Sequence, residues 1–262
     1  MKAAVQGVGN WLSGAAHGAG YSLTLMLRAV LWFRSALAPR AFRDIRQQMF
    51  VCGIASIPVV MIVSVFTGAI LALNGGISLA DLGQERLIGR IVVISMTREM
   101  GPFMTALILA ASVGSAMAAE LGTMKVSEEI DALDVMGVDP AKFLVMPRVV
   151  AMLFMCPMLT IYASCLGSLG GAAKAYFQFD VTLAQFKGDA FDHLVNKDVY
   201  TGLLKSVIFG LVIAVVGCSQ GLRATGGAIG VGRATRRAVV ISYLLIIILG
   251  YYVTFLFYGI EW

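Results

Sequence analysis

Residues 238–260, AVVISYLLIIILGYYVTFLFYGI, contain no Asp, Glu, Lys or Arg. A helix that crosses a bilayer needs about 20 predominantly apolar residues, and this stretch meets that length. The whole chain has the same character, because 59% of its 262 residues are hydrophobic and only 13% are charged. Soluble domains carry about 25% charged residues. The sequence is therefore that of an integral membrane protein.

Four further stretches lack all four charged residue types, namely residues 47–80, 100–119, 149–173 and 206–222. With residues 238–260 they predict an all-α integral membrane protein with five transmembrane helices. The first stretch is longer than one crossing requires, and Asn74-Gly75-Gly76 within it has strong turn chemistry. The stretch is therefore long enough to include a re-entrant or loop portion around these three residues.

Basic residues outnumber acidic ones, with 20 Lys and Arg against 15 Asp and Glu. In a membrane protein such an excess more often sets topology than binds nucleic acid. The loops on the N-terminal side of the membrane hold more Lys and Arg than the loops on the other side. The positive-inside rule then predicts a cytoplasmic N-terminus and a periplasmic C-terminus.

Residues 1–46 form an N-terminal region ahead of the transmembrane domain at 47–262. Across residues 21–50, leucines alternate with arginines such as Arg28 and Arg34. This pattern is typical of a helix lying in the cytoplasmic membrane interface. The alternative is a short sixth span over residues 18–33, which is disfavoured because Arg28 would lie within it.

The second span carries small residues every four positions, at Ala110, Gly114, Ala118 and Gly122. One face of this helix is therefore nearly smooth, and it permits close approach of another backbone. Either ordinary packing within the bundle or a contact near a two-fold axis would use such a face. The sequence favours ordinary packing.

Two charged residues, Arg98 and Glu99, come directly before the second apolar stretch, and Lys205 comes directly before the fourth. We expect all three at the outer membrane boundary, where ionisable groups are candidates for function. The alternatives are that Arg98 and Glu99 form a neutral pair anchoring a helix end, and that Lys205 extends to the lipid headgroups.

Residues 118–140, AAELGTMKVSEEIDALDVMGVDP, connect the second and third spans. They predict a short helix over 127–136 with Ser127 as its N-cap and Gly137 just after its end. Asp139-Pro140 should open the following helix. Several carboxylates make this cytoplasmic connection acidic, which indicates either a solvated surface helix or a docking element for a basic partner.

The glycine-rich residues 226–232 lack the Lys-Ser/Thr pair of a phosphate loop, so we interpret them as a flexible inner loop. The four cysteines, Cys52, Cys156, Cys165 and Cys218, lie in apolar stretches and are expected to be buried thiols. No metal-ligand or catalytic motif is recognisable, so neither a cofactor nor an enzymatic activity is expected.

Several separated motifs occur in an order that resembles a known family. They are residues 98–102 (REMGP), 114–140 (GSAMAAELGTMKVSEEIDALDVMGVDP), Pro147-Arg148 and 230–240 (GVGRATRRAVV). This set resembles the MlaE/YrbE permeases of ABC-type lipid transporters. The resemblance extends from about residue 47 to residue 259.

The resemblance implies a homodimer with an N-terminal interfacial helix and five transmembrane helices per chain, in a bacterial inner membrane. Its implied partners are a cytosolic ATPase of the MlaF type, an MCE-domain protein of the MlaD type and, in some systems, a STAS-domain protein. The implied substrate is phospholipid, moved between the inner membrane and the MCE protein in maintaining outer-membrane lipid asymmetry or related lipid trafficking. ATP hydrolysis is then expected on the partner chain.

The resemblance also assigns residues to two sites. The helix over 127–136 becomes a coupling helix, and the residues implied in ATPase contact are Glu128, Glu129, Asp131, Leu133 and Asp134. A lipid pocket at the dimer interface, open to the outer side, is implied to include Arg98, Glu99, Asp198, Lys205, Leu71, Asn74, Ser78 and Leu79. The sequence differs from the family pattern at two places that bear on how the lipid headgroup is bound. Ala111-Ser112 stands where the family commonly has Gly-Arg, and the last span lacks the aspartate that many family members carry.

Two other functions are considered alongside the ABC permease. A secondary transporter of a small or amphipathic solute would need charges at mid-membrane and inverted repeats, neither of which the sequence indicates. A lipid-modifying membrane enzyme would need a catalytic cluster, but the charges in the sequence are scattered.

Overall fold

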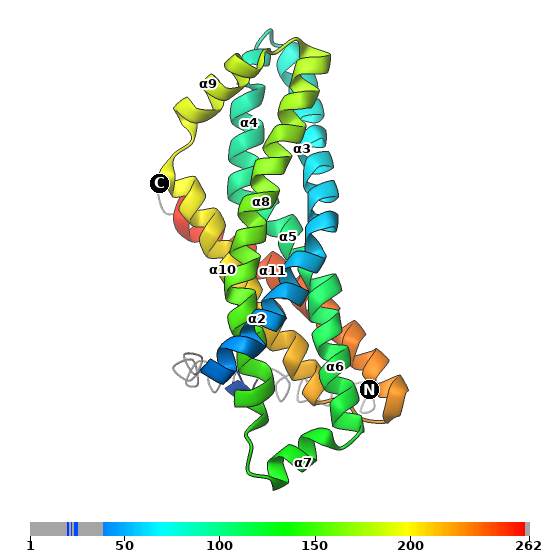
Figure 1. Cartoon of the computed structure of the whole chain (residues 1–262). Coiled ribbons are helices and arrows are strands. Elements are labelled where there is room, and N and C mark those ends of the chain that lie inside the picture. Colours follow the sequence, from blue (N-terminus) through cyan, green and yellow to red (C-terminus); the bar gives the residue numbers. More distant parts are fainter. Residues whose placement is uncertain (1–19, 21, 23, 26–38, 260–262) are drawn as a thin grey trace.

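The computed structural model describes residues 20, 22, 24–25 and 39–259 of the chain. Half of the residues of the interfacial helix expected over 21–50 therefore lie outside the described residues, and positions 39–50 belong to α2. Within them, five helical stretches are long and apolar enough to cross a membrane, which confirms the predicted count. The helices cluster into an elongated all-α bundle (Figure 1).

The first candidate span consists of α2 (Pro39–Gly53), a 3₁₀ turn η2 (Ile54–Ser56) and α3 (Ile57–Ala80). The expected loop portion at Asn74-Gly75-Gly76 is wrong, because α3 runs through all three residues without a break. The reason is tertiary packing: a Cβ added to Gly76 would lie 2.3 Å from the ring of Phe179. The low helix propensity of glycine is overridden where only a glycine fits beneath an aromatic ring.

The second candidate span is a continuous helical rod over Glu85–Val126. Its segments are η3 (Glu85–Leu87), α4 (Ile88–Ser95), the π-helical turn η4 (Met96–Met100), α5 (Gly101–Leu109), a second π turn η5 (Ala110–Gly114) and α6 (Ser115–Val126). The rod begins well before the charge-free stretch at residue 100. The charges at positions 98 and 99 therefore lie inside a helix rather than at its end.

The remaining described residues form two short helices, three long ones, a π turn and their connections. They are α7 (Glu129–Val135), the π turn η6 (Ala141–Val145), α8 (Met146–Phe179), α9 (Leu183–His193), α10 (Asn196–Leu222) and α11 (Gly227–Tyr258). Because α11 begins at Gly227, the flexible inner loop expected at 226–232 is wrong. Only Gly226 and Gly227, both with positive φ, form the sharp turn into the helix.

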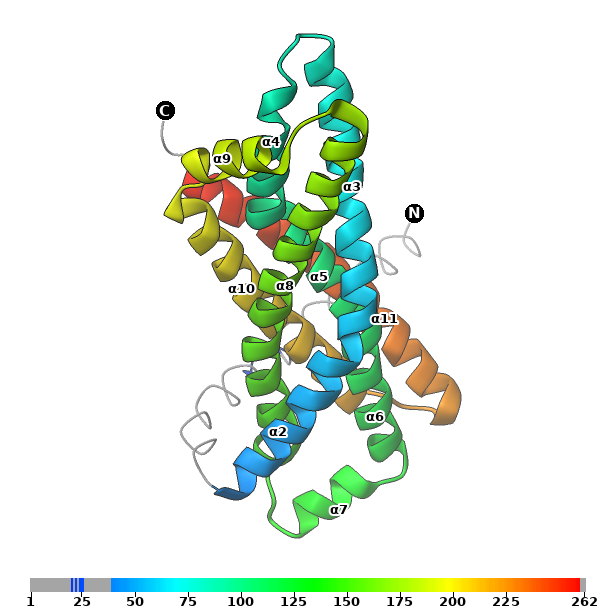
Figure 2. The same ribbon diagram turned by 45° about the horizontal axis from the view of Figure 1, so that its top comes forward.

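Helix α8 is central to the bundle, packing against α3 on one side and α10 on another. Helices α3, α4 and α8 run side by side toward the end that carries α9, while α10 and α11 cross the bundle obliquely (Figures 1 and 2). Helix α7 lies at the opposite end from α9. The proposed division of the chain after residue 46 falls within α2.

The four small residues that recur every four positions in the second span face inward. Ala110, Gly114, Ala118 and Gly122 are buried, and their face packs against α10 and the start of α11. The prediction of ordinary packing within the bundle is confirmed. The close approach of α6 and α10 follows from the absence of bulky side chains on that face.

Helix α11 is the least buried of the five candidate spans. One extended face of it exposes large apolar side chains, namely those of Leu244, Ile247, Ile248, Tyr251, Phe255 and Leu256. In a membrane, lipid or a second chain covers such a face. Among the cysteines, Cys52, Cys156 and Cys218 are buried as expected, whereas Cys165 is exposed on α8 and the expectation of a buried thiol there is wrong.

Candidate functional site

The π-helical turn η4 opens the backbone of the second span next to Arg98. Pro102 has no backbone N–H, so it cannot bond the carbonyl of Arg98 four residues earlier. The freed carbonyl oxygen of Arg98 instead accepts a hydrogen bond from Lys205 Nζ at 3.3 Å. π turns of this kind are frequent at functional sites.

Lys205 of α10 is 1% exposed and is fully engaged by this cluster. Its ammonium group also donates to Glu99 Oε1 at 2.5 Å and to Thr254 Oγ1 at 2.6 Å. An ammonium group has three donor hydrogens, and each has a partner here. Burial of the charge is tolerated because its attraction to Glu99 offsets part of the desolvation cost.

Asp198, in the first turn of α10, forms the second half of the cluster. Its Oδ1 accepts a hydrogen bond from the hydroxyl of Tyr258 at 2.6 Å and lies 3.6 Å from Arg98 Nη1. The guanidinium of Arg98 also lies 4.1 Å from the centre of the Tyr258 ring. Arg98 is thus held by a carboxylate and an aromatic face together, a pairing for which guanidinium is suited.

One close backbone contact brings these helices together. A Cβ added to Gly202 of α10 would lie 2.1 Å from the carbonyl oxygen of Thr97, so only glycine fits there. This contact is one turn from Lys205 on α10 and adjacent to Arg98 on η4. Positions 98, 99, 198 and 205, which are far apart in sequence, therefore meet in one ionic cluster with two positive and two negative groups.

The structure thus brings together four of the predicted site residues and adds two that were missed, Thr254 and Tyr258. Polar residues four positions apart within an apolar stretch were the available signal for these two. The alternative in which Arg98 and Glu99 neutralise each other at a helix end is wrong. Each pairs with a residue of α10, and the helix continues in both directions. Lys205 is likewise buried, which contradicts its extension to the headgroups.

The other predicted lipid-binding residues, Leu71, Asn74, Ser78 and Leu79, lie farther along α3. Gly68 of α3 packs against Gly167 of α8, which in turn packs against Met96 of η4, so Gly68 is level with the cluster. Helical rise puts Leu71 about 5 Å and Leu79 about 17 Å beyond that level. Leu71 and Leu79 are half-buried against an apolar cluster of α3, α4, α8 and α9, while Asn74 and Ser78 are exposed.

At the other end of the bundle, α7 differs at its start from the sequence prediction. Ser127 is not the N-cap, because Glu128 takes that position in a left-handed conformation with φ 61°. The end is as predicted: Gly137 has φ 74°, and Val138 N–H donates to the carbonyl of Leu133 at 3.0 Å, which is a Schellman closure. The predicted cap of the next helix is also confirmed, since Asp139 Oδ1 accepts from Ala141 N–H at 2.8 Å.

Helix α7 separates its apolar and acidic residues. Ile130 is buried and Leu133 is half-buried against the main core, so the helix is anchored to the bundle. The four predicted ATPase-contact carboxylates, Glu128, Glu129, Asp131 and Asp134, are all exposed. Asp131 pairs with Lys125 at 2.5 Å.

An ion pair that the sequence analysis missed joins the two helices flanking α7. Arg148 of α8, 7% exposed, donates to Glu120 Oε2 of α6 at 2.9 Å and to the carbonyl of Leu144 at 2.7 Å. The pair ties α6 to the start of α8 beside the α7 connection. Ser112, where the family resemblance implied an arginine, is exposed, and its hydroxyl donates to the carbonyl of Ile108.

Together these features define a multi-pass helical membrane protein with one internal ionic cluster and an acidic helix at one end. Residues 45–256 match the family described as Permease MlaE, and the chain belongs to this family of ABC transporter permeases. Such a permease works with an ATPase partner at the membrane.

Curated relatives agree with this membership. The chain is 40% identical over 216 residues to a probable ABC transporter permease protein of Rickettsia prowazekii, covering 82% of this chain and 83% of the relative. It is 37% identical to a probable ABC transporter permease protein of Synechocystis, covering 82% of each. It is also 35% identical over 217 residues to the chloroplastic protein trigalactosyldiacylglycerol 1 of Arabidopsis thaliana, covering 83% of this chain and 62% of that protein.

Proposed function

We propose that this chain is the permease subunit that moves phospholipids between a bacterial inner membrane and a periplasmic MCE-domain protein of the MlaD type. A cytosolic ATPase of the MlaF type supplies the energy, in some systems with a STAS-domain protein, and the chain works as a homodimer. The similarity to a relative named after a galactolipid supports a lipid substrate. The observation that carries the proposal is the ionic cluster around Arg98.

The residues of the cluster differ in solvent exposure, and this difference indicates a different role for each. Lys205 and Asp198 are buried and engaged by neighbours, so they hold the helices and do not touch a ligand. The side chains of Arg98 and Glu99 are 34% and 35% exposed. Arg98 is therefore the cation that meets a lipid phosphate, and charge-assisted hydrogen bonds to phosphate are strong. Leu71 and Leu79, on the periplasmic side of the cluster, supply an apolar wall for acyl chains that pass toward the MCE-domain protein.

The position of the cluster along α10 supports its contact with headgroups of the outer leaflet. Lys205 and Arg223 are separated by about 27 Å of helix, close to the roughly 30 Å thickness of the hydrocarbon layer. With Arg223 at the cytoplasmic boundary, the cluster lies near the periplasmic one. This orientation puts the N-terminus in the cytoplasm, the C-terminus in the periplasm and α7 on the side of the ATPase.

Helix α7 is then the coupling helix. Its exposed carboxylates, Glu128, Glu129, Asp131 and Asp134, meet basic groups of the ATPase, and Leu133 anchors the helix to the permease core. The apolar face of α11 is where a second copy of the chain or lipid packs.

The test is phospholipid transfer by the complex reconstituted with its ATPase and MCE partners. Arg98→Ala should lower both ATP-dependent transfer and the phospholipid that co-purifies, and Arg98→Lys should retain part of each because it keeps the charge. Lys187→Ala on the exposed surface of α9 is the matched control. Transfer and lipid content that stay at the wild-type level in Arg98→Ala would remove Arg98 from the site.

A secondary transporter is the second candidate, favoured by the buried charges of Asp198 and Lys205. Ionisable groups within membrane segments often mark ion pathways. Against this, the three donors of Lys205 are already satisfied by fixed partners. Solute translocation by the purified chain alone, without nucleotide hydrolysis, would establish this alternative and overturn the ABC proposal.

A further inference from the structure

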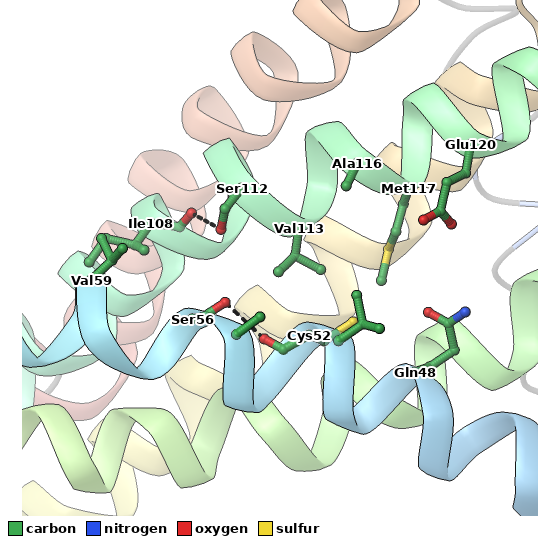
Figure 3. Close-up of a pocket in the computed structure, with 12 residues that line it drawn as sticks. Gln48, Cys52, Ser56, Val59, Ile108, Ser112, Val113, Ala116, Met117 and Glu120 are labelled. Carbon is green, nitrogen blue, oxygen red and sulfur yellow. Dashed lines mark hydrogen bonds between the residues drawn. The ribbon is translucent and has the colours of Figure 1, made fainter.

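A groove of about 240 Å³ lies between the first and second candidate spans, at the α7 end of the bundle. One wall comes from positions 48–59 of α2, η2 and α3, and the other from positions 108–120 of α5, η5 and α6. Figure 3 shows the two walls facing each other, with Gln48 and Glu120 at one end and Val59 and Ile108 at the other.

The groove is lined mainly by apolar side chains along its length. Its two hydroxyl groups bond their own helices, Ser56 to the carbonyl of Cys52 at 3.0 Å and Ser112 to the carbonyl of Ile108 at 2.7 Å. These hydroxyl groups therefore do not need a hydrogen-bond acceptor from a bound molecule. Ala55 and Ala116, on opposite walls, are small and exposed, so the groove opens sideways to the surroundings of the bundle.

The end near Gln48 and Glu120 is polar, and its one lining carboxylate, Glu120, lies beside the guanidinium of Arg148. The Glu120 side chain is 52% exposed, and only its Oε2 is used by the Arg148 guanidinium. Asp44 is also exposed, one helical turn before Gln48 on the same face of α2. Carboxylate and amide oxygens at the mouth of an apolar groove complement an ammonium group.

The dimensions match one leaflet of a bilayer. Each wall spans 11 or 12 residue steps, or about 17 Å of helix, roughly half of the 30 Å hydrocarbon thickness. In the proposed orientation, the mouth lies at the cytoplasmic boundary and the groove lies in the inner leaflet. The ionic cluster is separated from it, because Glu120 and Glu99 are 21 positions, or about 32 Å, apart along the second span.

We propose that this groove binds one acyl chain of an inner-leaflet phospholipid whose headgroup carries an amine. The acyl chain lies between the two alanine-containing walls, and the ammonium group meets Glu120 and Gln48. This site is distinct from the outer cluster. Its role as a loading position rests on the proposed function, but binding itself is measured separately.

The first experiment fills the groove. Ala116→Trp and, independently, Ala55→Trp insert a large side chain from opposite walls, and Met158→Trp on the exposed face of α8, outside the groove, is the control. The full chain is equilibrated in nanodiscs of equal phosphatidylethanolamine and phosphatidylglycerol and extracted into detergent, and its mass is measured by native mass spectrometry. Both groove variants should lose one retained lipid per chain, while Met158→Trp keeps it.

The second experiment changes the charge of the mouth while leaving the Glu120–Arg148 pair intact. Gln48→Glu should raise the retained ratio of phosphatidylethanolamine to phosphatidylglycerol by about two- to fivefold, the range expected for one exposed charge, and Gln48→Lys should lower it similarly. An unchanged ratio in both variants overturns the proposed headgroup preference.

Two outcomes overturn acyl-chain binding. If Ala116→Trp separates oligomers but keeps its lipid, the groove is a contact with a second copy. If all three tryptophan variants lose lipid equally, retention does not depend on the groove. Arg98→Ala measured beside them distinguishes this site from the proposed transport site, because its lipid loss should add to that of Ala116→Trp.

Discussion

The ionic cluster and helix α7 both concentrate charge, but they use it in opposite ways. In the cluster, Lys205 and Asp198 are buried and bonded to residues of other helices. On α7, the four carboxylates are exposed, and the described ion pairs include one of them, Asp131 with Lys125. Charge inside the bundle therefore holds helices together, whereas charge on α7 remains available to another molecule.

This difference teaches which substitutions should damage the fold and which should damage an association. Removing one member of a buried pair leaves the other without compensation and is costly. Removing an exposed carboxylate changes stability little, because solvent already screens it.

Lys205→Met should destabilise the protein most, by about 2–4 kcal/mol. The substitution removes the ammonium group that donates to the Glu99 carboxylate and to the Arg98 carbonyl. The range is below that for a fully buried pair because Glu99 is partly exposed. Thermal unfolding in detergent measures the effect, with Lys187→Met as the exposed control. Adding Glu99→Gln should recover part of the loss; no recovery would mean that Lys205 acts mainly through packing.

Reversing Glu128, Glu129 and Asp131 together to lysine should leave the thermal stability within about 1 kcal/mol while weakening ATPase binding more than tenfold. Co-purification of the ATPase measures the association, and the dimer should persist. Reversal of Asp81 and Asp192, exposed at the opposite end, is the control. Full ATPase binding by the triple variant would make α7 an ordinary solvated helix.

Tyr258→Phe should have an intermediate effect of about 1 kcal/mol, since it removes one hydrogen bond to Asp198 but keeps the ring beside Arg98. Thermal unfolding and retained phospholipid are both measured. A loss as large as that of Lys205→Met would mean that the hydroxyl organises the whole cluster.

The remaining effects, equal to that of Tyr258→Phe or smaller, concern the two ends of the α7 connection. Asp139→Ala should cost about 1 kcal/mol, because it removes the side-chain cap seen at Ala141 N–H. Ser127→Ala should cost less than about 0.5 kcal/mol, because its side chain caps nothing in α7. Equal thermal shifts for the two would contradict this assignment of the caps.

Local patterns in the sequence were sufficient for much of the fold. Apolar length identified five spans, and the Gly137 and Asp139-Pro140 signals marked two helix boundaries correctly. The same local reasoning failed at Asn74-Gly75-Gly76, at Ser127 and at residues 226–232. In the first case a distant aromatic ring decides the conformation, and in the last a helix begins at once after two left-handed glycines.

The candidate site was likewise predicted only in part from the sequence. Arg98, Glu99 and Lys205 were identified because charges beside apolar stretches are unusual, and Asp198 because it matches a family pattern. Thr254, Tyr258 and the Glu120–Arg148 pair were missed. Their roles depend on contacts with residues that are distant in the sequence. Lys205 and Glu99 are 106 positions apart, and no periodicity in the chain links them.

The membrane class, the five spans and the family follow from the amino-acid sequence alone, since they depend on apolar length, charge distribution and ordered motifs. The packed structure was needed to establish which charges are buried and paired, and where the second span meets α2 to form a groove. Such pairings depend on the angle and closeness at which helices cross, as at Gly202 and Thr97, and these are properties of the packed bundle.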